Sequence, residues 1–396
     1  MSLDYLQLRN QVRSLGEQAI KQEETLKSLQ EEASVVLKEY AEKQEKLREK
    51  VFRAVDQTRN LRCAIPGRES LNASFAVQEM KADLGIVAAD GSQINPDPHG
   101  AVMYYLINTG AIRLWCGKGE APGVFMESRL YYGDDLHTNH GTVSAGMVAL
   151  KRDLRERAFL SELVQAWIAE ERHPQVMLGL TDGPLELWEP RETSGDTAKE
   201  YREALEKYRK SLRELKHCGA ATAGYVDHPR ADLVVRLLEI AVLPENELSN
   251  ADTVRRYRGV TDTALFREIL HTGERSAVFG IQAQSAKDYP DELGLHFFYL
   301  NAGTSGRSVL ARVEIPAWVA KDDFLLNIVH SALLEQSRIL GTRSYPYLLH
   351  RAHEAAVVTY DDRDQLTQMI LLELRRRGIF VGEGSVKQAV KNQMKK

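Results

Sequence analysis

The segment GIVAADGSQ, residues 85–93, is the stretch of this sequence that decides its fold. Residues Ile86–Ala89 are small or β-branched apolar residues between Asp83 and Asp90, which is typical of a buried strand. We expect Asp90 at the end of this strand, where Gly91 allows a tight turn and the carboxylate is rigidly held and free to face a metal ion. Asp-Gly-Ser is also ordinary turn chemistry, and this stretch alone leaves both interpretations open.

A long helix is expected over residues 142–171, and acids lie on its apolar face. By helical spacing, Asp153 and Glu156 fall on the stripe formed by Leu150, Leu160, Leu163 and Trp167. A carboxylate in that position needs a partner. The partner is either an arginine of the same helix, Arg152 or Arg155, or a metal ion shared with the first strand.

A second apolar strand candidate, QVMLGLT at residues 175–181, leads directly into Asp182 and Gly183. The order of the first stretch, an apolar strand followed by Asp-Gly, is therefore repeated after the long helix. Two strand-end aspartates and a helical glutamate offer the converging oxygen ligands that a divalent cation needs. Together they predict a metal site better than any one of them alone.

Other segments complete a mixed α/β pattern. Residues 101–114 indicate one or two strands with a turn near 108–110, antiparallel to the first strand. Residues 295–300 and 309–315 indicate paired strands, whose aromatic residues 297–299 are expected in the core, with base stacking as the alternative.

A helix after Pro346 is expected to carry His353 on its apolar face, among Leu349, Ala352, Ala356 and Val357. A lone histidine on such a face is usually a hydrogen-bonded core residue. The acids at separate strand and helix positions favour a metal ligand instead.

Composition indicates an ordinary globular protein of 396 residues with a formal net charge of −4. This charge argues against a generally basic surface but permits nucleic acid in a local basic channel. One such surface is offered by Arg255, Arg256, Arg258, Arg267 and Arg275, although this cluster of arginines is explained equally well by a solvated face.

Three widely spaced cysteines indicate neither a disulfide framework nor a structural zinc site. The sequence has no apolar run long enough to span a membrane and no signal peptide, so we expect a cytoplasmic protein.

Residues 1 to about 60 form a highly charged helical pattern without proline. Steps of four and three residues relate Leu15, Ala19, Gln22, Leu26, Leu29, Ala33, Val36, Tyr40, Lys43, Leu47 and Val51. This coiled-coil stripe must be covered by a second copy, by the same chain or by a partner. We expect it to mediate oligomerisation.

Four motifs together resemble the NurA nuclease family. They are Asp90-Gly91-Ser92, the arginine-rich helix around Glu156, the segment Thr181–Leu185, and Tyr345-Pro346 followed by Ala352-His353-Glu354. The resemblance covers roughly residues 84–378. It implies a ribonuclease H-like mixed-sheet core flanked by helices, as a nuclease domain over 61–396 behind the coiled-coil helix of 1–60. The segments near 190–217 and 245–290 are expected to be helical insertions in that domain.

The resemblance also implies function. Members of this family are manganese-dependent DNA nucleases, with 5′–3′ exonuclease and single-strand endonuclease activity, that form ring-shaped homodimers. They work with the hexameric HerA ATPase in DNA end resection and double-strand break repair. Carried over residue by residue, the likeness implies that Asp90, Glu156, Asp182 and His353 bind Mn²⁺, or Mg²⁺ in its place, and that Tyr345 supports the site.

Two other functions fit the same residues. One is a non-catalytic DNA-end-binding or motor-adaptor protein, in which the carboxylates are structural. The other is a ribonuclease H-like enzyme that acts on RNA. The resemblance favours the DNA nuclease, with Asp153 and Glu162 as rivals of Glu156 for the ligand role on the helix.

Overall fold

The computed structural model describes residues 3–79, 82–138, 141–190, 195–304, 306–341 and 343–379. The chain folds into two compact units. Unit 1 combines Met1–Gln78 with Val226–Ala320, and unit 2 combines Glu79–Tyr225 with Lys321–Lys396. Both units are therefore built from two separate parts of the sequence.

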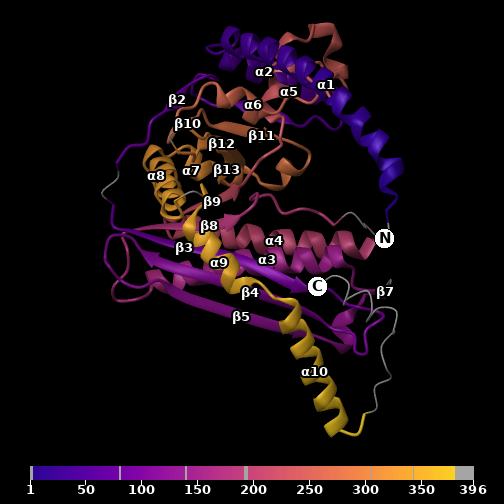
Figure 1. Ribbon diagram of the computed structural model, residues 1–396. Helices are drawn as coiled ribbons and strands as arrows, with labels where there is room; N and C mark the ends of the chain where they lie inside the picture. The colour runs from indigo at the N-terminus through magenta and orange to yellow at the C-terminus, as the bar shows by residue number, and fades with distance from the viewer. Residues whose placement is uncertain are drawn as a thin grey trace. The chain divides into compact units, whose positions relative to one another are not determined.

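Unit 2 is organised around a five-stranded mixed sheet (Figure 1). Its strands, in the order β9-β8-β3-β4-β5, are β9 (Ala221–Val226), β8 (Val176–Asp182), β3 (Leu84–Ile94), β4 (Tyr105–Trp115) and β5 (Gly123–Tyr131). The three strands that come first in the sequence pair antiparallel, whereas β8 and β9 join β3 in parallel. This arrangement confirms the mixed-sheet, ribonuclease H-like core.

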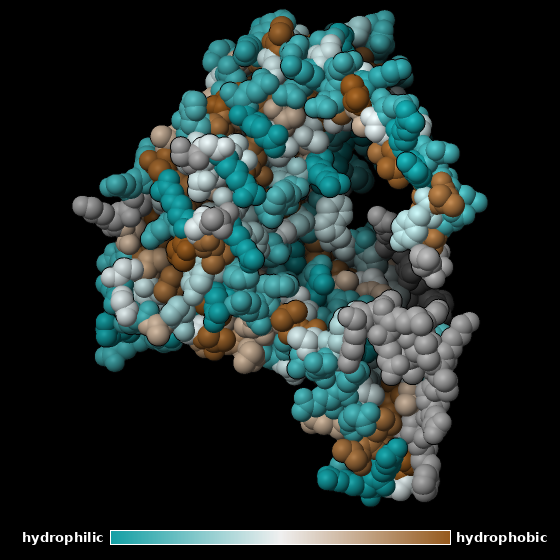
Figure 2. All heavy atoms as spheres, viewed as in Figure 1, coloured by the Kyte–Doolittle hydropathy of each residue, from teal (hydrophilic) through white to brown (hydrophobic). Residues whose placement is uncertain are grey.

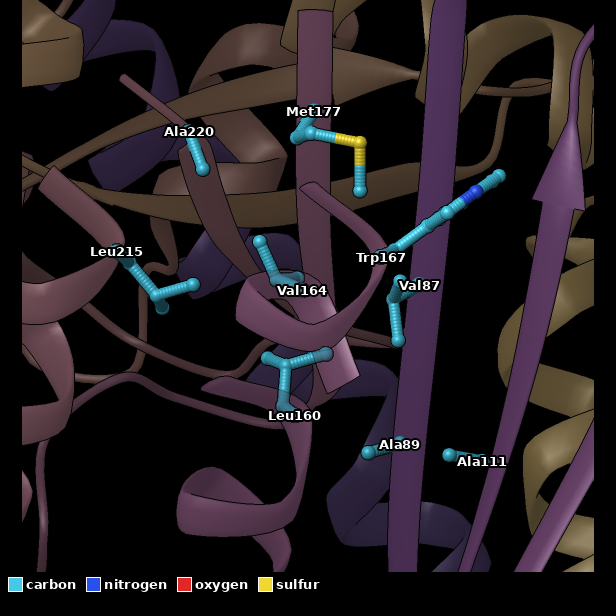
Figure 3. Packing of buried hydrophobic residues seen from close by; sticks show 9 residues of the cluster. All are labelled: Val87, Ala89, Ala111, Leu160, Val164, Trp167, Met177, Leu215 and Ala220. Carbon is cyan, nitrogen blue, oxygen red and sulfur yellow. The ribbon is translucent and has the colours of Figure 1, made fainter. Parts of the chain in front are cut away.

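Helices cover both faces of this sheet. On one face, α3 (Ala145–Ile168) packs between the sheet and α4 (Gly195–His217), and its residues Leu160, Val164 and Trp167 contact Val87 and Ala89 of β3 (Figure 3). On the other face lies α9 (Tyr347–Ala356). The remaining elements of unit 2 are η1 (Gly133–Leu136), β6 (His137–Thr138), β7 (Gly141–Thr142), α8 (Asp323–Ile339) and α10 (Tyr360–Arg376).

Two local expectations about this sheet were wrong. The predicted turn near residues 108–110 lies inside the continuous strand β4, and Asp90 lies inside β3 instead of at its end. In both places the polar or glycine residue serves a neighbouring helix instead of a turn, as described below. The parallel pairing of β3 with β8 does end at Ala89 and Thr181, immediately before the two aspartates.

Unit 1 contains a second group of strands with its own helices. The strands are β1 (Cys63–Pro66), β2 (Ser74–Phe75), β10 (Arg275–Ser276), β11 (Phe279–Gln282), β12 (Leu295–Asn301) and β13 (Leu310–Pro316). The helices are α1 (Tyr5–Glu39), α2 (Gln44–Gln57), α5 (Leu233–Val242), η2 (Glu245–Asn250), α6 (Asp262–Arg267), η3 (Ser285–Asp288), η4 (Asp291–Leu293) and α7 (Ala317–Ala320). The segment 245–290, expected to be helical, is thus a mixture of short helices and strands.

The predicted N-terminal helix exists, but a break at residues 40–43 divides it into α1 and α2. Its second half packs within unit 1, where Ala33, Leu37, Leu47, Val51 and Ala54 are buried. Its first half is exposed, and Figure 2 shows apolar side chains among the polar ones along it.

The aromatic residues 297–299 are fully buried, which confirms their core role. Arg275 is buried too and pairs with Glu69 at 2.9 Å, so it does not belong to a basic surface.

None of the helices in the described part of the chain combines the length and the apolarity that crossing a bilayer requires.

Candidate metal centre

Asp90 and His353 meet directly on the α9 face of the unit 2 sheet. The Nδ1 atom of His353 lies 2.7 Å from Oδ2 of Asp90, while Oδ1 accepts the backbone N–H of Gly91 at 2.8 Å. The Asp90 side chain is 14% exposed, whereas that of His353 is 61% exposed. His353 therefore lies at the solvent edge of the site, and not on the buried face where the sequence pattern put it.

Gly110 explains why α9 reaches Asp90. It is paired with Asp90 across β3 and β4, and paired residues direct their side chains to the same face of a sheet. A Cβ atom on Gly110 would lie 2.5 Å from the backbone nitrogen of Ala356 and 2.9 Å from the carbonyl oxygen of Ala352. The absent side chain thus lets the helix backbone touch the strand, which carries His353 to the aspartate.

The C-terminal end of α9 is fastened to the same two strands. The last turn of a helix leaves carbonyl groups without helical partners. The carbonyl oxygen of Ala356 accepts hydrogen bonds from the Ser92 hydroxyl and, at 2.7 Å, from the Asn108 amide. Asn108 is itself oriented by Ser128, whose hydroxyl donates to Oδ1 at 2.6 Å. Neither Asn108 nor Gly110 was predicted to shape the site, although a polar residue and a glycine within an apolar strand are a signal of such close packing.

Asp182 ends β8 on the same face as Asp90. Gly183 follows with a φ of +83°, which a residue with a side chain rarely adopts, and its N–H donates to the Tyr225 carbonyl at 2.8 Å. The Tyr345 hydroxyl donates a hydrogen bond to the Asp182 carboxylate, and the Tyr345 ring packs edge-to-face on Tyr225. Burial raises the pKa of Asp182, the Tyr345 hydrogen bond opposes that rise, and the Asp90 charge adds to it.

Glu156 approaches from the opposite face, on α3. It is 5% exposed, and its Oε2 atom would lie 3.5 Å from a Cβ atom on Gly91, so the missing side chain of Gly91 leaves room beside it. Burial raises the pKa of Glu156 well above its usual range. Arg157 opposes this rise, whereas the charge of Asp90 reinforces it.

The rival acids of α3 have other partners. Asp153 pairs with Arg152 at 2.6 Å. Glu162 has a side chain that is 55% exposed and pairs with Arg155 at 2.7 Å. Both acids therefore form ion pairs with arginines of the same helix, as the alternative to metal binding predicted for the acids of this face. Glu156 is the acid of the three that is buried.

Arg157 is a positioning residue that the sequence analysis did not single out. Its guanidinium donates to the carbonyl oxygens of Asp153 at 3.1 Å and Pro184 at 2.9 Å, and it stacks on the Tyr208 ring. Tyr208 donates in turn to the Leu185 carbonyl at 2.8 Å. Arg157 thereby fixes the turn that follows Asp182 to the helix that carries Glu156.

The predicted ligands thus form linked pairs. Asp90 contacts His353, Asp182 contacts Tyr345, and Glu156 lies within electrostatic range of Asp90. No three His, Cys, Asp or Glu side chains among the described residues already surround a common point at metal-binding distances. The donor set still fits a hard divalent cation, because buried carboxylates with raised pKa values lack the positive charge that such an ion would supply.

Comparison with known proteins identifies the family. The NurA domain model matches residues 84–358, which is more than half of the chain. No curated protein matches. The NurA nuclease of Sulfolobus solfataricus is 14% identical, with a TM-score of 0.46 over 76% of this chain and 86% of that chain.

Two further solved structures are more distant. The catalytic domain of human endonuclease V is 16% identical, with a TM-score of 0.34 over 73% of this chain and 85% of that one. A type 1 ribonuclease H, LC9-RNase H1, is 11% identical, with a TM-score of 0.22 over 49% of this chain and 84% of that one. The identification therefore rests on the family model, which includes Asp90, Glu156, Asp182, Tyr345 and His353 within its matched range. The chain belongs to the NurA domain family.

Proposed function

We propose that this protein is a metal-dependent DNA nuclease whose Asp90, Glu156, Asp182 and His353 bind Mn²⁺, or Mg²⁺ in its place. The observation that carries the proposal is the buried Glu156 carboxylate beside Asp90, with its pKa raised well above the usual range. Burial and the nearby Asp90 charge both disfavour the charged form of Glu156, Arg157 opposes them, and a divalent cation would favour that form further. Membership of the NurA family supports nuclease activity.

The side chains have distinct roles in this mechanism. Asp90 and Asp182 present carboxylate oxygens on one face of the sheet, and Glu156 adds its carboxylate from the other. His353 is hydrogen-bonded to Asp90 and completes the ligand set. Tyr345 orients Asp182 through its hydroxyl. These carboxylates would hold a divalent ion, which would supply a water molecule of lowered pKa for attack on a phosphodiester and would neutralise charge on the phosphate oxygens.

We propose 5′–3′ exonuclease and single-strand endonuclease activity in DNA end resection and double-strand break repair, by a homodimer that works with a HerA-type hexameric ATPase in the cytoplasm. Family membership supports this role.

A cleavage assay tests the proposal. The full chain is incubated with single-stranded DNA, double-stranded DNA or RNA of one sequence, with Mn²⁺, with Mg²⁺ or with a chelator. We expect Mn²⁺-dependent cleavage of DNA. Preferential cleavage of RNA would favour the ribonuclease H-like alternative, and binding without cleavage would favour the adaptor.

Two substitutions test the site. Asp90→Ala and Asp182→Ala each remove an anionic ligand, so we expect each to lower the cleavage rate by about a hundredfold or more, with little further loss in the double variant. Asp153→Asn is the matched control, because that acid is paired with Arg152. Calorimetric titration with Mn²⁺ and circular dichroism separate lost metal binding from lost folding. Wild-type cleavage by folded Asp90→Ala would remove this residue from the mechanism.

A further inference from the structure

Thr109 of β4 carries a hydroxyl group that is buried inside unit 2 without a hydrogen-bond partner. The residue is 1% exposed, and its Oγ1 atom is one of the buried side-chain atoms that lack a partner among the described residues. Most buried polar atoms in native proteins are paired, so an unpaired one requires an explanation. Core filling does not explain it, because a valine would fill the same volume without a hydroxyl.

The Thr109 side chain points to the α3 face of the sheet. Side chains along a strand alternate between its two faces. Ala111, two residues further along β4, packs in the same apolar cluster as Leu160 of α3 (Figure 3). Gly110, which lies between the two, rests against α9 on the other face. Thr109 therefore shares a face with Glu156 of α3.

Gly91 of β3 is the residue directly opposite Thr109. The Cβ atoms of directly opposite residues are about 4.5–5.5 Å apart. A Cβ atom on Gly91 would lie 3.5 Å from Oε2 of Glu156 and 2.8 Å from Cγ of Arg152. The Thr109 hydroxyl and the Glu156 carboxylate thus border the position that a Gly91 side chain would occupy. At this spacing a side-chain rotation or one water molecule joins the two groups.

The acid on the other side of Thr109 already has its own donors. Glu127 of β5 is the residue opposite Thr109 on that side. Its carboxylate accepts hydrogen bonds from Arg155 of α3 at 2.6 Å and from Arg129 of its own strand. Of the two carboxylates beside Thr109, Glu156 is therefore the one that its hydroxyl can serve.

The arginines around Glu156 direct hydrogen bonds to other acceptors. Arg152 and Arg157 both act on Glu156 through their charge. Arg152 donates to the Asp153 carboxylate at 2.6 Å, and Arg157 donates to the carbonyl oxygens of Asp153 and Pro184. The Nε atom of Arg157 is unpaired, which makes it the rival donor to Glu156. Carboxylates that bind metal ions are themselves held by hydrogen bonds, and loss of such a partner typically costs 10–100-fold in metal affinity.

We propose that Thr109 is a positioning residue of the metal centre, whose hydroxyl donates a hydrogen bond to the Glu156 carboxylate, directly or through one water molecule, when that carboxylate binds a divalent ion. Thr109 does not touch the ion. The bond holds one oxygen of Glu156, so the other is directed to the ion. This inference rests on the proposed role of Glu156 as a metal ligand.

Calorimetric titration of the full chain with Mn²⁺ tests the proposal, together with thermal melts in a chelator. Thr109→Val keeps the shape of the side chain and removes an unpaired hydroxyl, so we expect the metal-free variant to melt at or above the wild-type temperature. Its Kd for Mn²⁺ should rise about tenfold or more. Thr109→Ser keeps the hydroxyl, and its Kd should stay within about twofold of the wild-type value.

Thr222→Val is the matched control. Thr222 is another buried threonine of this sheet, 1% exposed, but its hydroxyl donates to the carbonyl oxygen of Gly179 at 3.2 Å. Loss of that hydrogen bond should lower the melting temperature and leave the Kd for Mn²⁺ unchanged. A threonine that serves stability alone thus differs from Thr109 in both measurements.

The Glu156→Gln background shows whether the two residues act together. If the hydroxyl acts through Glu156, Thr109→Val should weaken Mn²⁺ binding in the wild type and have little further effect in Glu156→Gln. An unchanged Kd in folded Thr109→Val would overturn the proposal and favour Arg157 as the donor. An equal loss in Thr109→Ser, or a full additional loss in Glu156→Gln, would also overturn it. A wild-type chain that binds no Mn²⁺ would overturn the proposed function, and this inference with it.

Discussion

At the scale of single residues, Glu156 is a buried carboxylate that lies near a second carboxylate, Asp90. It is a carboxylate with 5% exposure on the apolar side of α3, beside a strand that carries Asp90. Its neighbours Asp153 and Glu162 are paired with arginines, but Glu156 has a raised pKa. The folded, metal-free protein therefore holds a proton on this group more tightly than the unfolded chain does.

This difference predicts the pH dependence of stability. Because the folded-state pKa lies above the usual value of 4.5, the stabilising contribution is complete below pH 4.5 and is lost as the pH rises through the folded-state pKa. Glu156→Gln removes the charge, so we expect it to stabilise the metal-free protein at pH 8 by about 1–3 kcal/mol and to do much less at pH 4. Thermal melts in a chelator at both pH values measure this.

The control for that experiment is Glu162→Gln, which changes an exposed acid of the same helix. Added Mn²⁺ should raise the Tm of the wild type and of the control more than that of Glu156→Gln, since an amide is a poor ligand for a hard cation. An equal response to Mn²⁺ in Glu156→Gln would show that another acid binds the metal.

At the scale of secondary-structure elements, the close approach of α9 to β4 decides the geometry of the site. The helix backbone rests on Gly110, and its last carbonyl is bound by Ser92 and Asn108. These contacts help to hold the helix that carries His353 against the strands.

Gly110→Ala tests this contact. The new methyl group would meet backbone atoms of α9 at 2.5–2.9 Å, which no side-chain rotation can relieve. We expect a loss of about 1–3 kcal/mol in the free energy of unfolding, the usual range for overpacking, and weaker Mn²⁺ binding as His353 moves from Asp90. Chemical denaturation and calorimetric titration measure the two effects.

Gly91→Ala is the matched comparison. Its new methyl group would meet Cγ of Arg152 at 2.8 Å, and a flexible side chain can move away. Its effect on stability should therefore be the smaller of the two. Equal stability of Gly110→Ala and the wild type would show that the helix is not held by this contact.

At the scale of the whole molecule, the N-terminal helical region divides into two parts with different roles. Residues 5–18 are exposed apart from partly covered Leu8, whereas α2 and the end of α1 supply buried residues to unit 1. Lys50 of α2 also donates to the carbonyl oxygens of Ala241 and Leu243 at 2.9 and 2.6 Å, at the end of α5.

Two deletions separate these roles. Removal of residues 1–18 should change the free energy of unfolding by no more than about 0.5 kcal/mol, because it takes away exposed side chains. Removal of residues 1–57 opens the core of unit 1 where Leu37, Leu47 and Val51 were buried, at about 2–5 kcal/mol for each large side chain, which is comparable to the whole stability of a domain.

Melting curves and light scattering distinguish the outcomes. If residues 1–18 take no part in dimerisation, the chain that lacks them remains a dimer. If the exposed coil of α1 is the interface, as its heptad stripe predicts, that chain becomes a monomer. Cooperative unfolding of the chain that lacks residues 1–57, at the wild-type temperature, would show that the helices are a separate appendage.

The sequence by itself determined the elements whose signals are local. The apolar runs around Val87 and Leu178 predicted buried strands, and helical spacing placed both Asp153 and Glu156 on an apolar stripe. The choice of Glu156 between them came from the family resemblance. Asp-Gly after an apolar strand marked a turn correctly at Gly183, whereas the same pair at Asp90 and Gly91 lies inside β3. These signals, with the family motifs, were enough to predict the mixed-sheet core.

Only the tertiary structure decided how distant residues combine. Asn108 and Gly110 indicate a turn by local preference, but they lie within a strand because α9, more than two hundred residues later, occupies the space above them. No local signal in the sequence indicates that unit 1 is assembled from two separate parts of the chain. The conformational preference of a residue contributes a fraction of a kcal/mol to folding, and the burial of an apolar helix face contributes more. Which helix face covers which strand depends on residues far apart in the chain, so local sequence patterns do not predict it.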